Sequence, residues 1–416
     1  MGLALGLSEL CIFLYLTNKT LKDSDSIVYN ILFCYLCQIL NYKLVGNLAW
    51  ISFGVNLYSS DCTILLMIFI WVVKGMKIKK RLYMGLVGVF LIMAGQAAIR
   101  GLMTFGMSSE FWGDLRKFLY FGMSILYFYN VPIKRPLRAF ERNVYRVFNF
   151  LTIYALIILA FYFAGMPLGE RANERPLLAD FAIIYAAFAA YNWYKDLILS
   201  DKPEISMKTI LYTITLILNR FNTTWVALLV SLGVLIISRV RDKNSTTLSK
   251  KFYFQVAIIA ILVGIFTSSN NVIMYRLMES TAKFDTNENN TFSSRIELWQ
   301  SMISFVQGRF ALIGYPFGSG FHAYYRGSYW QASPHNGYIE SLLRTGYIGV
   351  VALVISIITI MKQAFVKRNI LPIMLCAICM TFWGAYSLTF EQGVLIGLCA
   401  HYVFRREGQY ELDNIY

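Results

Sequence analysis

Long apolar segments constrain the fold of this chain more than any other feature. A membrane-spanning helix needs about 20 apolar residues, or somewhat fewer where flanking side chains reach the interface. Fourteen segments come near this length, at 1–17, 26–41, 44–58, 62–74, 82–99, 117–131, 147–165, 179–194, 206–219, 222–238, 252–268, 345–361, 370–386 and 388–404. The shortest of them leave room for merging or shifting. The sequence predicts an all-α polytopic membrane protein with about 14 transmembrane helices.

The overall composition supports this class. The chain is 57% hydrophobic and only 15% charged, with a mean hydropathy of +0.53. Soluble domains carry about a quarter charged residues, so a soluble fold of this length is excluded. The formal net charge of +15 is spread over separate loops rather than gathered on one face. That spread argues against a nucleic-acid partner and favours contact with anionic membrane lipids.

Lysine and arginine in short loops predict the orientation. Basic residues crowd the loops at 74–81, 134–146, 239–251 and 362–368. Such loops lie on the cytoplasmic side of bacterial membranes. Fourteen spans place all four loops on that side, with both termini cytoplasmic.

One long polar insertion, residues 269–344, interrupts the regular alternation of spans and short loops and faces outward in this topology. Within it, "RIELWQSMISFV" has apolar residues at helical spacing, which predicts a short amphipathic helix at the membrane surface. The stretch "GYPFGSGFHAYY" predicts a tight glycine-rich loop. We therefore divide the chain into 1–268 with spans 1–11, 269–344 as the long outer loop with short helices and the catalytic motif, and 345–416 with spans 12–14 and a cytoplasmic tail.

The seven cysteines indicate neither a disulfide framework nor a metal site. All lie in or beside apolar spans and none in the long outer loop. The pairs at Cys34 and Cys37 and at Cys376 and Cys379 have redox or zinc spacing, but each sits inside an apolar helix, which favours packing. The outer side also lacks an Asp-rich metal motif or the paired carboxylates of glycoside hydrolases. We expect no metal and no cofactor.

Arginine dominates the positive charge on the outer side, where positive charge is otherwise rare. The planar guanidinium suits phosphate better than the lysine ammonium does. Each arginine alone is also explained by solvation or by lipid headgroups, whereas the group favours a polyanionic ligand. The set is Arg100, Arg171, Arg175, Arg220, Arg276, Arg295, Arg309, Arg326 and Arg344. Arg220 lies between two spans with almost no loop, so it either snorkels to the interface or faces a polar cavity.

The stretch "QASPHNGYIESLLRTGYIG" contains the most reactive candidate, His335. Ser333 and Pro334 predict a helix start, with a hydroxyl cap and a proline in the first turn. His335 then lies in that turn, where the helix dipole disfavours protonation and keeps the imidazole available as a general base. Glu340 either orients it or neutralises Arg344. The competing interpretation is an interfacial histidine with a purely structural role.

Three motifs together resemble a known family. "SSRIELW", "LIGYPFGSGF" and "HNGYIESLLRTGYIG" resemble the C-terminal signature of the O-antigen polymerase and O-antigen ligase superfamily, over about residues 215–360. The resemblance implies a bacterial inner-membrane glycosyltransferase with a GT-C-like fold. It also implies transfer from an undecaprenyl-diphosphate-linked oligosaccharide at the periplasmic face, without a metal.

The chemistry of this transfer leads us to expect roles for individual residues. His335 would activate the acceptor hydroxyl, while Arg295, Arg220, Arg171 and Arg175 would bind the diphosphate. Guanidinium groups there would stabilise charge that grows as the glycosidic bond breaks. Further substrate contacts are expected from Asn336, Glu340, Tyr338, Tyr324, Arg309 and Arg326.

Three functions remain open at this point. A polymerase moves the growing glycan onto a new lipid-linked repeat unit, and the count of fourteen spans and the idiosyncratic sequence favour it. A ligase moves the glycan to lipid A-core, and ligases resemble twelve-span rather than fourteen-span proteins. A flippase would show repeated halves and charges at mid-membrane, which this sequence lacks. Expected partners include a chain-length regulator and a flippase of the same pathway.

Overall fold

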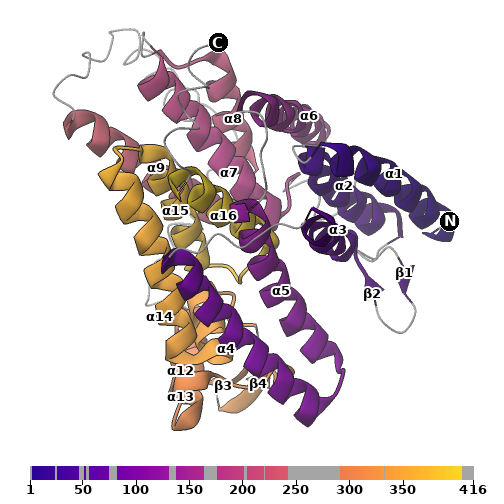
Figure 1. The fold of residues 1–416 in the computed structure, drawn as a ribbon, viewed down its shortest axis with the longest axis vertical. Helices are drawn as coiled ribbons and strands as arrows, with labels where there is room; N and C mark the ends of the chain where they lie inside the picture. Colours follow the sequence, from indigo (N-terminus) through magenta and orange to yellow (C-terminus); the bar gives the residue numbers. More distant parts are fainter. Residues whose placement is uncertain are drawn as a thin grey trace.

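The computed structural model describes residues 2–23, 26–45, 51–52, 56–74, 82–130, 137–163, 176–200, 204–219, 221–241, 291–325, 327–331 and 333–404. These residues are almost entirely helical (Figure 1). The first part holds α1 Gly2–Lys22, α2 Ile27–Val45, β1 Ile51–Ser52, β2 Asn56–Leu57, α3 Ser59–Val73, α4 Leu82–Phe105, α5 Ser109–Asn130, α6 Leu137–Phe163, α7 Ala179–Tyr194, the π-helix η2 Lys195–Leu199, α8 Met207–Leu218 and α9 Asn222–Arg241.

The C-terminal part combines short outer elements with long helices. It holds α12 Thr291–Ser304, α13 Arg309–Ile313, β3 His322–Tyr325, β4 Ser328–Gln331, α14 Gly337–Val366, α15 Ile370–Trp383 and α16 Phe390–Phe404. α12 confirms the amphipathic helix expected in the long insertion. Met302 on this helix is fully buried beneath the β3–β4 hairpin and α14, while Ile303 is exposed.

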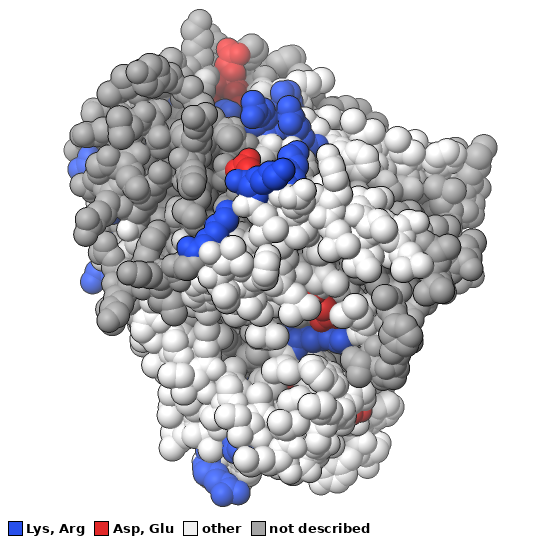
Figure 2. All heavy atoms as spheres, turned by 45° about the vertical axis from the view of Figure 1, so that its right-hand side comes forward, with Lys and Arg blue, Asp and Glu red and all other residues white. Residues whose placement is uncertain are grey.

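The helices identify an all-α membrane protein. Among the described residues, four helical segments are long and apolar enough to cross a membrane, at Met84–Phe105, Glu141–Phe161, Asn222–Arg239 and Gly337–Val366, and shorter apolar helices accompany them. Large apolar side chains are exposed along the outside of these helices, as expected for a surface in contact with lipid. Figure 2 shows that uncharged residues cover most of the described surface of one face, with charged groups confined to patches.

The predicted span at 44–58 is wrong. In its described residues, α2 ends at Val45, and Ile51–Ser52 then pairs antiparallel with Asn56–Leu57. The segment is short, and its glycines and asparagines favour a turn over a helix. Without this span, the number of predicted membrane crossings near the N-terminus changes by one. The argument that both termini are cytoplasmic therefore loses its basis. The span predicted at 252–268 lies outside the described residues.

α5 is the central helix of the bundle and contacts α3, α4 and α16. Its Phe121 ring packs edge-on against Trp383 of α15, with 5.8 Å between centroids. Gly393 of α16 lies directly over the Phe121 carbonyl, where any side chain would clash with the backbone. This close approach fixes the position of α5, which carries charged residues toward the outer loop.

α14 begins eight residues before the span predicted at 345–361 and is kinked within its length. Gly346 has a φ of +64°, so the helix breaks there and resumes. A Cβ on Gly346 would collide with the Leu312 carbonyl, and one on Gly314 would collide with the Arg344 backbone. The two glycines let α13 lie directly on the kink. The kink thus marks where the outer elements meet the long apolar helix.

Candidate functional site

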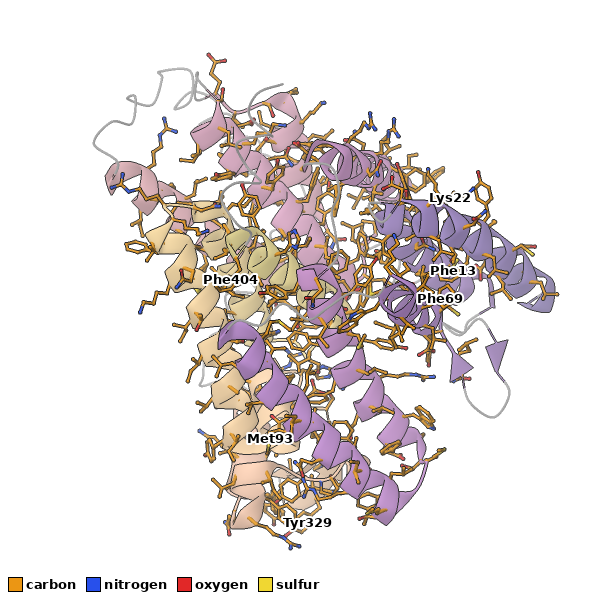
Figure 3. All side chains as sticks on the ribbon, viewed as in Figure 1. Phe13, Lys22, Phe69, Met93, Tyr329 and Phe404 are labelled. Atoms are coloured by element: carbon orange, nitrogen blue, oxygen red, sulfur yellow. The ribbon has the colours of Figure 1, made fainter. Side chains whose placement is uncertain are left out.

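The outer elements gather at one end of the molecule. α12, α13, the β3–β4 hairpin and the first part of α14 lie together beside the ends of α4 and α5 (Figure 1). Tyr329, on the hairpin, marks this end, and Met93 on α4 lies above it (Figure 3). The glycine-rich loop, residues 314–321, connects α13 to the hairpin and lies at the centre of this region.

α4 holds the start of the glycine-rich loop. The Arg100 guanidinium donates hydrogen bonds to the carbonyls of Ile313 at 3.1 Å and Gly314 at 2.8 Å. Further along, the Phe317 amide donates to the Ala97 carbonyl at 3.0 Å. Arg100 was expected among the arginines facing a polyanion. Its guanidinium instead binds backbone carbonyls, so its role is to hold the loop.

A buried ion pair holds the rest of the loop. Asp114 on α5 and Arg344 on α14 lie 2.8 Å apart, and their side chains are 6% and 1% exposed. The Asp114 carboxylate also accepts a hydrogen bond from the Gly318 amide. The Arg344 guanidinium also donates to three loop oxygens, those of the Pro316 carbonyl, the Ser319 hydroxyl and the Gly320 carbonyl. Arg344 therefore organises the loop and does not face a ligand.

A second ion pair joins α5 to α14 one helical turn away. Lys117 Nζ lies 2.7 Å from Glu340 Oε1. The other oxygen, Oε2, accepts a hydrogen bond from the Leu388 amide at 3.1 Å. Glu340 was expected to orient His335 or to neutralise Arg344. It hydrogen-bonds neither residue, because both carboxylate oxygens bind other partners, but its negative charge still acts on both.

Asn336, rather than Ser333, caps the helix that follows the loop. Its side-chain oxygen accepts hydrogen bonds from the amides of Tyr338 at 3.0 Å and Ile339 at 3.1 Å. Its side-chain nitrogen donates to the Gly384 carbonyl. The prediction that Ser333 and Pro334 start the helix, with His335 in its first turn, is wrong. His335 has a φ of +44°, which is incompatible with a helical turn and places it outside α14.

His335 is held by its backbone while its ring stays accessible. The Trp299 indole N–H of α12 donates to the carbonyl of Pro334, the preceding residue, at 2.6 Å. The His335 side chain is exposed and makes no hydrogen bond to any other described residue. A left-handed conformation in a non-glycine residue costs energy and occurs often at functional sites. The backbone therefore positions the imidazole, and no side-chain hydrogen bond to the described part of the chain occupies it.

The surroundings of His335 favour the neutral imidazole. Partial burial lowers its pKa below the usual value, and the positive charges of Arg295 and Lys117 lower it further, against the opposing charge of Glu340. Neutrality was predicted from the helix dipole. The structure attributes it instead to desolvation and to two cations from α12 and α5.

Arg295 lies on α12, one turn before Trp299, and its side chain is partly exposed. It forms no ion pair within the described part of the chain, unlike Arg344 or Lys117. Trp299 of the same helix bonds the Pro334 carbonyl next to His335, and the positive charge of Arg295 is among the causes that lower the His335 pKa. A guanidinium that has no ion-pair partner among the described residues is suited to an anionic ligand.

The other expected site residues divide into three groups. Arg309 and Tyr324 are exposed at the outer end. Tyr338 turns into the bundle, where its hydroxyl donates to the Met380 carbonyl at 2.9 Å. Four arginines lie outside the described residues, namely Arg171, Arg175, Arg220 and Arg326.

Sequence reasoning missed Asp114 and Lys117. Both lie in "EFWGDLRKFLYF", at the start of an otherwise apolar helix. Charges three residues apart share one helix face, and charges beside a span are unusual enough to indicate function. The sequence therefore contained a signal for these two residues. It did not identify their partners, because Arg344 and Glu340 lie on a helix far away in the sequence.

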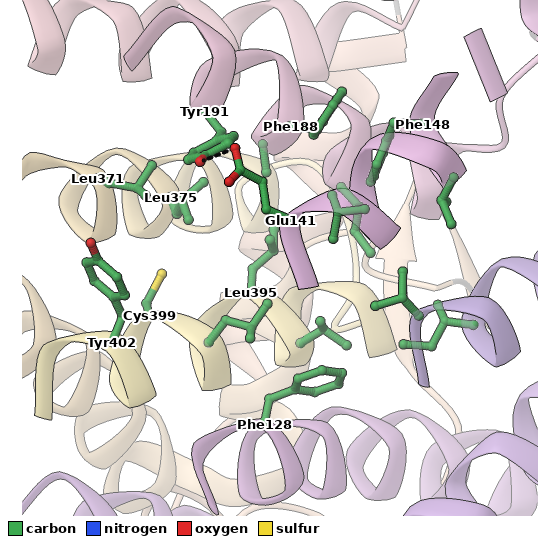
Figure 4. A pocket seen from close by; sticks show the side chains of 18 of the residues that line it. Phe128, Glu141, Phe148, Phe188, Tyr191, Leu371, Leu375, Leu395, Cys399 and Tyr402 are labelled. Carbon is green, nitrogen blue, oxygen red and sulfur yellow. Dashed lines mark hydrogen bonds between the residues drawn. The ribbon is translucent and has the colours of Figure 1, made fainter. Parts of the chain in front are cut away.

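A separate apolar cavity lies away from this site. It measures about 210 Å³ and is lined by α2, α5, α6, α7, α15 and α16. Figure 4 shows Phe148, Phe188 and Leu395 facing it, with the Glu141–Tyr191 hydrogen bond at its edge. None of its lining residues belongs to the glycine-rich loop or to α12. The cavity and the His335 region are thus distinct.

Comparison with known proteins finds a similarity over part of the chain. A family model described as O-antigen ligase matches residues 208–354. No curated protein matches the chain. The matched stretch includes Arg295, His335 and Arg344, whereas Asp114 and Lys117 lie before it.

Proposed function

Because residues 208–354 make this chain a member of the O-antigen polymerase and ligase superfamily, we propose that it is an O-antigen polymerase. It would transfer a growing glycan from undecaprenyl diphosphate to a hydroxyl of a new lipid-linked repeat unit at the periplasmic face. The observation that carries the proposal is the 2.6 Å bond from Trp299 of α12 to Pro334, which brings the helix that carries Arg295 next to the exposed His335 at the outer end of the bundle.

The chemistry assigns one task to each group. The acceptor hydroxyl oxygen attacks the anomeric carbon of the donor, and its proton passes to the neutral imidazole of His335. The bond between that carbon and the phosphate oxygen breaks, and the diphosphate keeps the electron pair. Arg295 stabilises the negative charge that grows there, which lowers the transition state more than the ground state. Proton acceptance by a positioned base contributes about 10²- to 10⁴-fold to such reactions.

The surrounding contacts explain how the chain would hold these groups in place. The Trp299 bond to Pro334 and the Asn336 cap fix the backbone on both sides of His335. Arg344 and Arg100 hold the glycine-rich loop, whose backbone approaches α4 and α14 closely. A base that is held rigidly stays close to the orientation that the reaction needs. Arg220, Arg171 and Arg175 remain proposed diphosphate contacts.

O-antigen ligase is the alternative, and the matching family model, described as O-antigen ligase, supports either function. Polymerase and ligase use the same donor, so the same base and the same cations would serve either acceptor. The span count that favoured a polymerase included 44–58, which forms no separate helix in its described residues. The acceptor therefore has to be identified by experiment.

The two enzymes leave different lipopolysaccharides when the gene is deleted. Loss of the ladder, with a single repeat unit still attached to core, identifies a polymerase. Loss of every attached repeat, with lipid-linked polymer accumulating, identifies a ligase. An intact ladder of normal length contradicts both functions.

Substitution of His335 tests the site itself. In the deletion strain, His335→Ala is expected to abolish chain formation. His322→Ala is the matched control, because His322 is also exposed and lies at the start of β3 with its ring near the Ser319 carbonyl. The control should restore the ladder. A normal ladder with His335→Ala, at wild-type protein level, would show that His335 is not the base.

A further inference from the structure

The apolar cavity between α2, α5, α6, α7, α15 and α16 has its polar lining residues at one end. Glu141 lies near the start of α6, Tyr191 near the end of α7, and His401 and Tyr402 near the end of α16. Leu371, at the start of α15, lies toward the same end, and apolar side chains line the rest (Figure 4). We call this polar end of the cavity its mouth.

Solvent reaches the mouth. Glu141 Oε1 accepts a hydrogen bond from the Tyr191 hydroxyl at 3.0 Å and lies 2.8 Å from Lys195 Nζ. The Glu141 side chain is 21% and the Lys195 side chain 46% exposed. Because charged groups are costly in hydrocarbon, this exposed pair marks the level where the cavity meets the membrane interface.

The cavity is about as long as one leaflet of a bilayer. Its lining runs from Phe181 to Tyr191 on α7 and from Val394 to Tyr402 on α16. At the helical rise per residue, these stretches span about 15 Å and about 12 Å. The hydrocarbon of one leaflet is about 15 Å thick. A single acyl chain that enters at the mouth would therefore reach the far end of the cavity near the middle of the bilayer.

A hydrocarbon chain suits the interior of the cavity better than water does. Apolar cavities of about 150 Å³ stay dry and bind apolar molecules, and this one measures about 210 Å³. Left empty, it would deprive its lining side chains of van der Waals partners on one side. Lipid chains surround the protein at this depth and are as apolar as the lining, so a chain enters without leaving hydrocarbon.

Positive side chains gather at the mouth end. Arg142 and Arg146 are exposed on the first turns of α6, next to Glu141 in sequence. Arg368 is exposed two residues before α15, the helix that begins beside the mouth. Together with Lys195 they come from three elements. Basic groups at the ends of transmembrane helices bind the headgroups of anionic lipids.

The nearby carboxylates leave these arginines available. Glu141 is paired with Lys195. Asp196 accepts hydrogen bonds from the Ser206 amide and the Thr209 hydroxyl at the start of α8. Within the described residues, neither carboxylate forms an ion pair with an arginine. The guanidinium groups at the mouth can therefore contact the phosphate of a lipid.

We propose that this cavity binds one acyl chain of an anionic phospholipid, whose phosphate lies at the mouth near Arg142, Arg146 and Lys195. α14 begins next to His335 and ends at Val366, just before α15, so the mouth lies toward the end opposite His335. The lipid thus belongs to the cytoplasmic leaflet in the proposed orientation. Bound there, the chain fills the space between α6 and α7 on one side and α15 and α16 on the other. This inference is independent of the proposed function.

Photo-crosslinking of the wild-type protein tests the position of the chain. The protein is placed in phosphatidylcholine nanodiscs that contain phosphatidylglycerol with a diazirine near the end of one acyl chain. After illumination, mass spectrometry should find the lipid on Phe181 and Val394, which line the cavity and are buried from the surrounding bilayer. Labelling confined to exposed residues on the outside of α6, such as Ile153 and Ile157, would overturn the proposal.

A cavity-filling variant tests the space itself. Ala187 lines the cavity, so Ala187→Phe places a ring inside it and should abolish labelling of Phe181 and Val394. The matched control is Ala160→Phe, the same change at an exposed position of α6, which should leave labelling unchanged. Labelling that persists in Ala187→Phe would contradict binding in the cavity.

The headgroup is tested with a phosphatidylcholine probe that carries the same photoreactive chain. A basic residue near the membrane surface favours an anionic lipid by about 1 kcal/mol, or about fivefold. The phosphatidylglycerol probe should therefore label the cavity several times more strongly, and Arg142→Gln with Arg146→Gln should remove the difference. Lys208→Gln, an exposed lysine on α8, is the control and should keep it. Equal labelling of the wild type by both probes would overturn the anionic headgroup.

Two further arms separate this lipid from the glycan carrier. Unlabelled phosphatidylglycerol should compete with the probe, and undecaprenyl phosphate at the same concentration should not. Competition by undecaprenyl phosphate alone would reassign the cavity to an isoprenoid chain and overturn the proposal. His335→Ala should be labelled like the wild type, because the cavity and the His335 region are distinct. Loss of labelling in His335→Ala would contradict that separation.

Discussion

Asp114 and Arg344 form a buried ion pair, 2.8 Å apart, that joins α5 to α14. The same two side chains also bind the glycine-rich loop, Asp114 at the Gly318 amide and Arg344 at the Ser319 hydroxyl. The pair therefore couples the packing of two helices to the conformation of the loop beside His335.

Removing the charge of Asp114 should destabilise the protein strongly. Asp114→Asn leaves the Arg344 guanidinium buried without its counter-ion, which costs about 3–5 kcal/mol. Thermal unfolding in detergent would measure the loss. The control is Glu110→Gln on the same helix, whose exposed carboxylate should change stability by less than about 0.5 kcal/mol. Equal unfolding temperatures for Asp114→Asn and the wild type would mean that the pair contributes nothing.

The pH dependence of activity should reveal the charge next to His335. Because His335 must be neutral to accept a proton, kcat/KM should fall as pH drops through its pKa. That pKa is lowered below its ordinary value of about 6.5, so the acidic limb should lie below this pH.

Arg295→Gln tests the cause of this shift. The substitution removes a positive charge that lowers the pKa, so the pKa should rise and the acidic limb should move to higher pH. Lys362→Gln, at the far end of α14, should leave the limb in place. If the acidic limb of the kcat/KM profile does not move in the Arg295→Gln variant, Arg295 does not lie close to His335.

Gly346 should not tolerate a side chain. Its positive φ and its contact with the Leu312 carbonyl both oppose alanine, so Gly346→Ala should destabilise the protein by at least about 1 kcal/mol. Gly113→Ala is the matched control, because Gly113 lies in α5 with open space around it. Alanine there should be neutral or stabilise by about 0.5–1 kcal/mol. Similar unfolding temperatures for the two variants would contradict the close approach of α13 to the kink.

Cysteine labelling should show the two ends of the bundle on opposite sides of the membrane. In a background where the exposed Cys11 is replaced by serine, Ser328→Cys on the hairpin should react with a membrane-impermeant maleimide applied from the periplasmic side. Lys367→Cys, after α14, should react only once the membrane is permeabilised. Labelling of both positions in intact spheroplasts would refute the proposed orientation.

Local sequence patterns determined much of the fold. Apolar runs of helical length predicted most of the described helices, and the spacing of Trp299 and Met302 predicted the amphipathic α12. The glycines around Pro316 predicted a tight loop, and the histidine–asparagine motif led to the family that the comparison identifies. Each of these features depends on residues close together in the chain, so one sequence contains all the information they need.

Tertiary structure alone decided the partners of the charged residues. From the sequence, the nearest opposite charge to Glu340 was Arg344, one turn along the same helix. In the folded chain Glu340 pairs with Lys117 and Arg344 with Asp114, because the charged side chains of α5 reach the first part of α14. This tertiary arrangement, rather than the helix dipole, sets the charge around His335. Electrostatic and packing interactions act through space, so the residues that complete the site were decided by how distant helices meet.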